Sequence, residues 1–192
     1  MNLPNKLTLA RVLMAPIAFI FVLYPIGGEI CARIIAATVF LLTALTDMLD
    51  GKIARKYNLI TNFGKFMDPL ADKFMVIGML VALCASDMYA KFRPVLIWAT
   101  LLVILRELAV TSLRLLVASS DQKIVVAANW LGKIKTVLQI VCIMTLILEP
   151  LVLPFDSYLI LSFVTIALMG IMTVWSGIHY LKSYLGFINP NE

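Results

Sequence analysis

Four aspartates near the middle of the chain have the type and spacing needed to bind cations. Asp47 and Asp50 are three residues apart, and Asp68 and Asp72 are four residues apart. Either spacing places two side chains on one face of an α-helix, one turn from each other. The stretch at 56–65 between the pairs is polar and contains a glycine, which predicts a short turn. The two helices should therefore run antiparallel, with both pairs of carboxylates facing each other.

Carboxylates that are clustered in this way repel one another and are costly to bury, and divalent cations remove the repulsion. An oxygen-only ligand set suits hard ions such as Mg²⁺ or Mn²⁺. Four aspartates can bridge two ions about 3.5–4 Å apart, an arrangement that clamps a transferring phosphoryl group. Gly51 and Gly64 leave room for a ligand near the backbone, and Arg55 is placed to pair with a phosphate. The alternative is that the aspartates only cap helices and pair with nearby basic residues.

The composition indicates that membrane-spanning helices position these residues. Of the 192 residues, 62% are hydrophobic and 14% are charged, against about 45–50% and about 25% in ordinary soluble domains. This excludes a disordered chain, and it disfavours a soluble globule because the interior of a 21.3 kDa protein is too small for so much apolar surface. We expect one all-α, polytopic membrane domain over residues 1–192.

Six apolar segments, bounded by glycine, proline or charged residues, predict six transmembrane helices. They run over about 12–24, 31–49, 70–85, 94–117, 125–148 and 158–180. Their continuous apolar character disfavours a β-barrel, in which apolar and polar residues would alternate. Residues 2–11 mix polar and apolar side chains, which predicts either a short N-terminal interfacial segment or a simple extension of the first span.

The distribution of charge predicts the orientation in the membrane. Six spans place both termini on one side, and 13 of the 16 lysines and arginines fall at that end of the spans. The positive-inside rule makes this side cytoplasmic, so we expect a multi-pass protein of the inner (cytoplasmic) membrane whose termini and aspartates face the cytoplasm. The basic residues do not gather on a soluble face, and we therefore expect no nucleic-acid partner.

Several other polar residues are expected to have no chemical role. Glu29, Asp87, Glu149 and Asp156 fall on the opposite side of the membrane and are interpreted as ordinary loop acids. The three cysteines are far apart and lack the spacing of a metal site, so we expect free, buried thiols. His179, the single histidine, is expected at the membrane interface.

The aspartate region resembles the signature of the CDP-alcohol phosphotransferase family, which is D-x-x-D-G-x-x-A-R, then eight residues, then G-x-x-x-D-x-x-x-D. All eight fixed positions match: Asp47, Asp50, Gly51, Ala54, Arg55, Gly64, Asp68 and Asp72. The resemblance implies a six-helix membrane fold, usually a homodimer, in which the four aspartates hold two divalent ions. It also implies that Asp72 is the general base and that Gly51, Arg55 and Gly64 hold the cytidine diphosphate part of the donor.

Other stretches are similar to bacterial members of the family whose acceptor is sn-glycerol 3-phosphate. These are Asn2–Asn5 with Thr8 and Arg11, Arg106-Glu107 followed by residues 111–114, and Gly132–Thr136 with Gln139. The similarity implies transfer of the phosphatidyl group from CDP-diacylglycerol to glycerol 3-phosphate, with release of CMP, in phosphatidylglycerol biosynthesis. The acyl chains of the donor would stay among the membrane lipids.

Basic residues within the fourth and fifth segments are candidates for binding the phosphate of that acceptor: Arg106, Arg114, Lys133 and Lys135. Charges inside spans are rare and typically mark substrate pathways. The alternative is that the lysines only extend to the interface and that Arg106 pairs with Glu107. Adjacent helical residues do not face each other, so we expect Glu107 to orient another basic group instead.

Two other functions stay open from the sequence. The same reaction can use phosphatidylglycerol, inositol phosphate or serine as acceptor. Lys135 favours a phosphorylated acceptor, because cardiolipin-forming members of the family tend to have asparagine there. A cation transporter or channel would also contain intramembrane charges. However, the two halves of the chain show no internal repeat, and the charges gather at one end of the spans.

Overall fold

All described secondary structure is helical. The computed structural model describes residues 2–56, 61–119, 130–153 and 159–184, which form six α-helices and one 3₁₀ turn without any strand. The elements are α1 (Leu3–Leu23), α2 (Glu29–Lys56), α3 (Asn62–Ala85), η1 (Asp87–Tyr89), α4 (Arg93–Ser119), α5 (Trp130–Val152) and α6 (Ile160–Tyr184). The six predicted helical segments are confirmed. The first three helices extend well beyond their apolar segments at the end that carries the aspartates.

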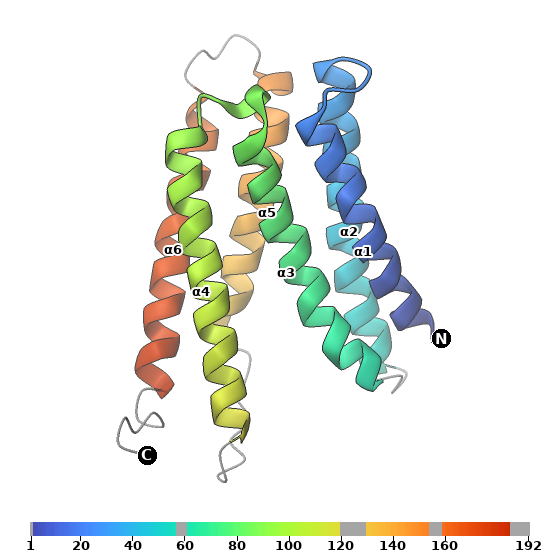
Figure 1. Ribbon diagram of the computed structural model, residues 1–192, viewed down its shortest axis with the longest axis vertical. Coiled ribbons are helices and arrows are strands. Elements are labelled where there is room, and N and C mark those ends of the chain that lie inside the picture. Colours follow the sequence, from blue (N-terminus) through green and yellow to red (C-terminus); the bar gives the residue numbers. More distant parts are fainter. Residues whose placement is uncertain (1, 57–60, 120–129, 154–158, 185–192) are drawn as a thin grey trace.

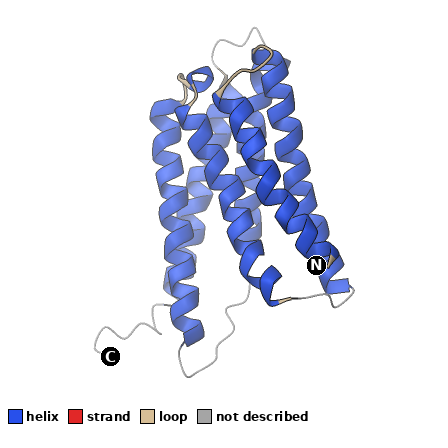
Figure 2. Ribbon diagram, turned by 45° about the vertical axis from the view of Figure 1, so that its right-hand side comes forward, coloured by secondary structure: helices blue, strands red, loops and turns tan. Residues whose placement is uncertain are grey.

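Consecutive helices run in opposite directions through the bundle (Figure 1). α1 packs against α2 and α3, and α6 packs against α4 and α5, while contacts between α3 and α4 and between α2 and α5 join the two groups. The turned view shows the same long helices side by side (Figure 2). The start of α1, the end of α2, the start of α3 and the end of α6 therefore lie at one end of the bundle.

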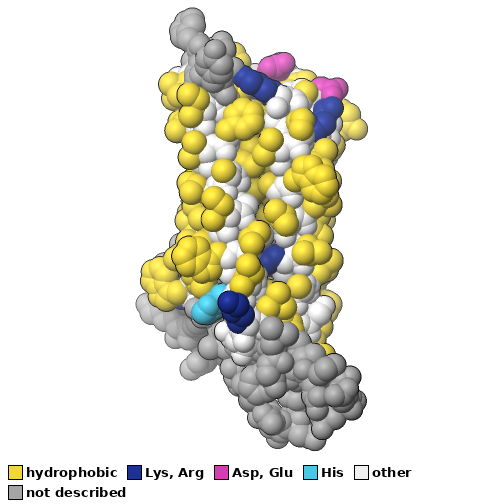
Figure 3. Space-filling view, turned by 90° about the vertical axis from the view of Figure 1, so that its left-hand side faces the viewer, with side chains coloured by type: hydrophobic (Ala, Val, Ile, Leu, Met, Phe, Trp, Pro, Cys, Tyr) yellow, Lys and Arg dark blue, Asp and Glu magenta, His cyan; other side chains and the backbone are white. Residues whose placement is uncertain are grey.

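Within the described residues, five helices are long and apolar enough to cross a membrane. Their candidate spans are Asn5–Leu23, Glu29–Asp47, Arg93–Leu116, Trp130–Val152 and Ile160–Ser183. Apolar side chains cover most of the face formed by the later helices, and charged ones lie mainly toward its two ends (Figure 3). The chain is a multi-pass membrane protein. The remaining helix, α3, differs because its first half carries Asp68, Asp72 and Lys73.

The N-terminal residues form the first turns of α1, so the prediction of a separate interfacial segment is wrong. α1 is one continuous helix, with Pro4 in its first turn. A proline is tolerated there because the missing N–H would have no partner within the helix. The polar side chains that suggested an interfacial segment, Asn5, Thr8 and Arg11, are buried. They face other helices rather than a membrane surface.

A close contact between α1 and α3 fixes the placement of the aspartates on α3. A Cβ atom at Gly78 would lie 2.5 Å from Cζ of Phe19. The Phe19 ring is itself held edge-on against Phe74, with 5.6 Å between ring centroids. A larger residue at position 78 would therefore have to move a packed ring, and only glycine lets the two helices approach this closely.

Buried polar side chains tie together the end of the bundle that is remote from the aspartates. Glu149 on α5 accepts hydrogen bonds from the backbone amides of Leu161 and Ser162 at 2.9 and 2.7 Å. These amides lie in the first turn of α6, where no carbonyl of the same helix is available. The interpretation of Glu149 as an ordinary loop acid is therefore wrong.

Arg33 is buried over the Tyr89 ring at the same end of the bundle. Burial raises the pKa of Tyr89 to about 12, which keeps its hydroxyl neutral.

The cysteines and the histidine have the surroundings of structural residues. All three thiols are free, as predicted, and Cys142 is buried. Cys84 is only partly buried and Cys31 is exposed, so the expectation of burial is wrong for Cys31. His179 is exposed near the end of α6, as expected for an interfacial position.

Candidate active site

The predicted site aspartates whose side chains are described lie at one end of the bundle, on two helices. Asp47 lies in the second half of α2, and Asp68 and Asp72 lie one turn apart near the start of α3. α3 begins where Thr61 acts as its N-cap, because the Thr61 hydroxyl accepts a hydrogen bond from the Gly64 amide at 3.0 Å. This cap sets the position of the helix that carries Asp68 and Asp72.

A buried arginine from α1 joins aspartates on two other helices. The side chain of Arg11 has an exposed fraction of 0%, and its Nη1 atom lies 2.5 Å from Oδ1 of Asp47. The same nitrogen contacts Oδ1 of Asp72. One guanidinium nitrogen thus links α1, α2 and α3 at the acidic end of the bundle.

Two further contacts attach α1 to the start of α3. The Thr8 hydroxyl donates a hydrogen bond to Oδ1 of Asp68 at 2.7 Å, and the Thr61 hydroxyl donates to Oδ1 of Asn5 at 2.9 Å. A Cβ atom at Gly64 would lie 3.3 Å from that Asn5 oxygen and 3.6 Å from Oδ2 of Asp68. The glycine therefore permits a tight approach of α1, and its predicted part in donor binding stays a prediction.

From the sequence, Asn5, Thr8 and Arg11 stand out only for their similarity to other family members, and no role in the site is predicted for them. The signal that identifies them is their spacing of three residues, which places them on one face of a helix that is mostly apolar. A polar face on such a helix needs polar partners inside the protein, and here those partners are the residues around the aspartates.

Three predicted site residues lie in the last turns of α2. The backbone of α2 continues through Asp50, Gly51 and Arg55 to its end at Lys56. Their side chains lie outside the described residues. The predicted role of Asp50 in metal binding, and those of Gly51 and Arg55 in donor binding, stay predictions.

The chemistry of the aspartates fits a hard divalent cation. Among the described side chains, no three carboxylates, thiols or imidazoles are close enough to form a metal-binding group, and Asp50 falls outside that comparison. However, oxygens of Asp47 and Asp72 approach one nitrogen of Arg11 from two different helices. These carboxylates therefore converge on a single positive centre. Carboxylate oxygens are the ligands that Mg²⁺ and Mn²⁺ prefer.

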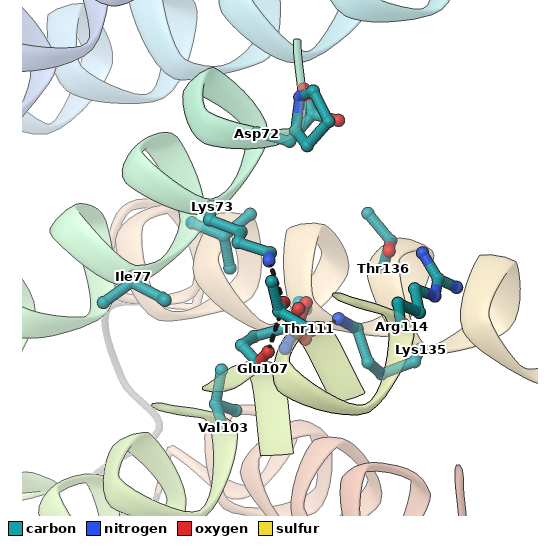
Figure 4. A pocket seen from close by; sticks show the side chains of 12 residues that line it. Asp72, Lys73, Ile77, Val103, Glu107, Thr111, Arg114, Lys135 and Thr136 are labelled. Carbon is teal, nitrogen blue, oxygen red and sulfur yellow. Dashed lines mark hydrogen bonds and ion pairs between the residues drawn. The ribbon is translucent and has the colours of Figure 1, made fainter. Parts of the chain in front are cut away.

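A cavity of about 220 Å³ opens beside Asp72 between α3, α4 and α5 (Figure 4). It is lined by Pro69, Asp72, Lys73, Val76 and Ile77 of α3, Val103, Glu107, Thr111 and Arg114 of α4, and Lys135, Thr136 and Gln139 of α5. The structure thus brings Arg114 and Lys135, two of the four basic residues predicted to bind a phosphate, into one cavity with Asp72.

An ionic network crosses the wall of this cavity. Glu107 forms ion pairs with Lys135 and, at 3.2 Å, with Nη1 of Arg106. The expectation that Glu107 orients another basic group is confirmed by Lys135. The expectation that Arg106 and Glu107 make no direct pair is wrong, because these side chains are long enough to meet although they start in different directions. Lys73 donates a hydrogen bond to the Thr111 hydroxyl in the same wall.

The other two predicted phosphate-binding residues do not line this cavity. Arg106 is buried, with its Nε atom 3.2 Å from the Ser176 hydroxyl and its guanidinium 5.3 Å from the centre of the Tyr180 ring. It contacts the cavity lining through its ion pair with Glu107. Lys133 is exposed and lies two residues before Lys135, the first α5 residue of the cavity lining. By contrast, Arg114 does line the cavity, and a hydrogen bond of 3.0 Å to the Tyr180 hydroxyl holds its guanidinium in place.

Comparison with known proteins identifies the family. The profile of the CDP-alcohol phosphatidyltransferase family matches residues 1–176. The chain belongs to this family. The match includes both aspartate pairs and all three helices that line the cavity. This CDP-alcohol phosphatidyltransferase therefore has its candidate site within the part of the chain that the family shares.

Individual relatives of this CDP-alcohol phosphatidyltransferase cover most of its length. It is 44% identical over 164 residues to the CDP-diacylglycerol–glycerol-3-phosphate 3-phosphatidyltransferase of Bacillus subtilis, covering 81% of this chain and 80% of that protein. It is 35% identical over 183 residues to the protein of the same name from Escherichia coli, covering 95% and 94%. A probable phosphatidylglycerophosphate synthase of Mycobacterium tuberculosis is 36% identical over 184 residues, covering 96% and 82%.

Proposed function

We propose that this protein transfers the phosphatidyl group of CDP-diacylglycerol to sn-glycerol 3-phosphate, forming phosphatidylglycerophosphate and CMP in phosphatidylglycerol biosynthesis. The names of the Bacillus and Escherichia relatives state this activity. Both relatives align with most of the chain, and the family match includes the entire candidate site.

The observation that carries the proposal is the shared cavity of Asp72, Arg114 and Lys135. Glycerol 3-phosphate has a hydroxyl that must lose a proton and a phosphate that needs cations. One cavity that offers a carboxylate on α3 and basic groups on α4 and α5 meets both needs. Arginine and lysine are the side chains that pair with phosphate oxygens.

The proposed reaction is a substitution at the phosphorus that carries diacylglycerol. Asp72 accepts the proton of the primary hydroxyl of glycerol 3-phosphate. The hydroxyl oxygen bonds to that phosphorus, and the bond from the phosphorus to the oxygen of CMP breaks. Arg114 and Lys135 hold the acceptor's own phosphate, so that its hydroxyl end stays next to Asp72.

We further propose that Asp47, Asp50, Asp68 and Asp72 hold two Mg²⁺ or Mn²⁺ ions. Such ions would neutralise and polarise the diphosphate of the donor. Gly51, Arg55 and Gly64 are proposed to hold the cytidine diphosphate part. The convergence of Asp47 and Asp72 on one nitrogen of Arg11 supports a cation site between α2 and α3.

The proposed topology has six membrane spans. The 24 residues of α3 extend about 36 Å at roughly 1.5 Å per residue, which is enough to cross the hydrocarbon core. Seven of the described basic residues lie in the half of the bundle that holds the aspartates: Lys6, Arg11, Lys73, Arg114, Lys133, Lys135 and Lys182. Three lie toward the other end: Arg33, Lys91 and Arg93. This bias supports an active site and termini on the cytoplasmic side of the inner membrane. A homodimer is proposed from the family resemblance alone, and cross-linking in membranes tests it.

The function is tested by offering several acceptors to the purified protein together with CDP-diacylglycerol and Mg²⁺. The mixture contains glycerol 3-phosphate, phosphatidylglycerol, inositol phosphate and serine at equal concentration, and mass spectrometry identifies the lipid product. We expect phosphatidylglycerophosphate as the main product. A different main product would overturn the choice of acceptor but keep the transferase. Absence of CMP release with every acceptor would overturn the transferase and favour cation transport.

A further inference from the structure

Gln139 is a buried amide in the wall of the candidate acceptor cavity. It lies on α5 one turn after Lys135, so both side chains share a helix face. Its exposed fraction is 2%, and its Nε2 atom has no hydrogen-bond partner within the described ranges. A buried amide donor without a partner costs about 1–3 kcal/mol. Such a group is typical of a position where a bound molecule completes the hydrogen bonding.

The other uncharged polar side chains that line the cavity are already engaged. The Thr111 hydroxyl donates to the Glu107 carbonyl at 2.6 Å and accepts from Lys73. The Thr136 hydroxyl donates to the Gly132 carbonyl at 3.1 Å. Of the neutral side chains that the structure describes in this wall, Gln139 is the one with an N–H or O–H donor left for an occupant. The volume of about 220 Å³ exceeds the space of a single water, which takes up roughly 30 Å³ in the liquid.

We propose that the Gln139 amide binds the secondary hydroxyl of the acceptor and thereby selects glycerol phosphate over phosphorylated alcohols that lack this hydroxyl. The inference rests on the proposed function. The acceptor has three polar parts, and the charged residues of the lining account for two of them. Arg114 and Lys135 bind the phosphate, and Asp72 accepts the proton of the reacting hydroxyl. The remaining hydroxyl both donates and accepts a hydrogen bond. An amide is the matching neutral partner because it carries a donor and an acceptor side by side.

The experiment compares two acceptors and two forms of the full-length protein in the presence of CDP-diacylglycerol and Mg²⁺. The acceptors are glycerol 3-phosphate and 3-hydroxypropyl phosphate, which keeps the reacting hydroxyl and the phosphate but lacks the secondary hydroxyl. We expect the unmodified protein to prefer glycerol 3-phosphate by about 10- to 100-fold in kcat/KM, the range for one buried hydrogen bond. In Gln139→Leu, kcat/KM for glycerol 3-phosphate falls by the same factor, kcat/KM for the analogue stays nearly unchanged, and the preference is lost.

Two controls separate recognition from folding. Gln139→Met is a second apolar replacement of similar length, and the unfolding midpoint of each variant is measured in detergent. An equal loss with both acceptors would overturn the inference, because it would indicate a structural role for the amide. Absence of any preference in the unmodified protein would also overturn it, without the need for a variant. A failure of the proposed function differs from these outcomes, since glycerol 3-phosphate would then yield no lipid product at all.

Discussion

Nη1 of Arg11 on α1 lies 2.5 Å from Oδ1 of Asp47 on α2. The same atom contacts Asp72 on α3, and the arginine side chain is fully buried. The first helix therefore supplies a positive charge to the centre of an acidic site that two other helices form. α1 thus stabilises the site as well as crossing the membrane, because the positive charge of Arg11 offsets the repulsion between the carboxylates of Asp47 and Asp72.

Replacement of this arginine should destabilise the protein and lower its activity. Arg11→Ala leaves Asp47 and Asp72 without a shared cation. Their side chains are 33% and 45% exposed, so the cost should stay below the roughly 3–5 kcal/mol of a fully buried pair. Arg11→Lys keeps the charge on a shorter side chain and should lose less. The measurements are the thermal unfolding midpoint in detergent and the rate of CMP release. Lys6→Ala, an exposed position on the same helix, is the control and should change neither; equal behaviour of the two alanine variants would contradict the prediction.

Removal of the proposed base should lower turnover strongly without unfolding the protein. In Asp72→Asn the side chain keeps its shape but no longer accepts the proton, and general-base catalysis is worth roughly 10²–10⁴ in rate. We expect kcat to fall within that range, as measured by formation of the lipid product. Asp87→Asn is the matched control, because Asp87 is 98% exposed at the opposite end of the bundle. Near-normal turnover in Asp72→Asn would show that Asp72 is not the base.

The two neighbouring lysines of α5 should differ in their effect on acceptor binding. Lys135 lines the cavity and Lys133 does not. Loss of a charged hydrogen bond costs about 1.5–3 kcal/mol, so Lys135→Met should raise the KM for glycerol 3-phosphate roughly 10- to 100-fold. The KM for CDP-diacylglycerol should stay nearly constant in this variant. Lys133→Met should have little effect on either KM; an equal rise in both variants would mean that Lys133 also reaches the phosphate, as predicted from the sequence.

Divalent ions should bind to the aspartates in the absence of substrate. Titration of the detergent-solubilised protein with Mn²⁺, followed through the electron paramagnetic resonance signal of the free ion, should show two bound ions per chain. Asp68→Asn removes one charged ligand and should weaken binding by about tenfold or more. Asp87→Asn should bind like the unmodified protein. Identical titration curves for Asp68→Asn and the unmodified protein would exclude Asp68 as a ligand.

Two glycines in helices should respond in opposite ways to alanine. Gly78→Ala forces a methyl group against the Phe19 ring, which Phe74 holds in place, and overpacking of this kind costs about 1–3 kcal/mol. At Gly170 on α6 a Cβ atom meets nothing within 4 Å, so Gly170→Ala should be neutral or stabilise the helix by up to about 1 kcal/mol. The unfolding midpoints in detergent test the pair. A lower midpoint for Gly170→Ala than for Gly78→Ala would contradict the packing argument.

The sequence by itself determined the helices, their order and the chemistry of the acidic pairs. Long apolar runs in lipid can satisfy their backbone groups within a helix, so their number and polarity decide the element type. The pairing of Asp68 with Asp72 follows from the local geometry of one helix turn. The matched signature of eight positions, 47–72, then indicated the family, which the comparison confirmed. All of these features depend on residues that are close together in the chain.

The tertiary structure alone decided which distant residues meet. It brought Arg11 to Asp47 and Asp72, placed Arg114 and Lys135 in the same cavity as Asp72, and left Lys133 outside its lining. It also placed the unpaired amide of Gln139 in that cavity. Each residue step turns a helix by about 100°, so a small rotation decides whether a side chain faces a cavity or the lipid. That rotation is set by contacts between helices, such as Phe19 against Gly78, and the local pattern of one helix does not contain it.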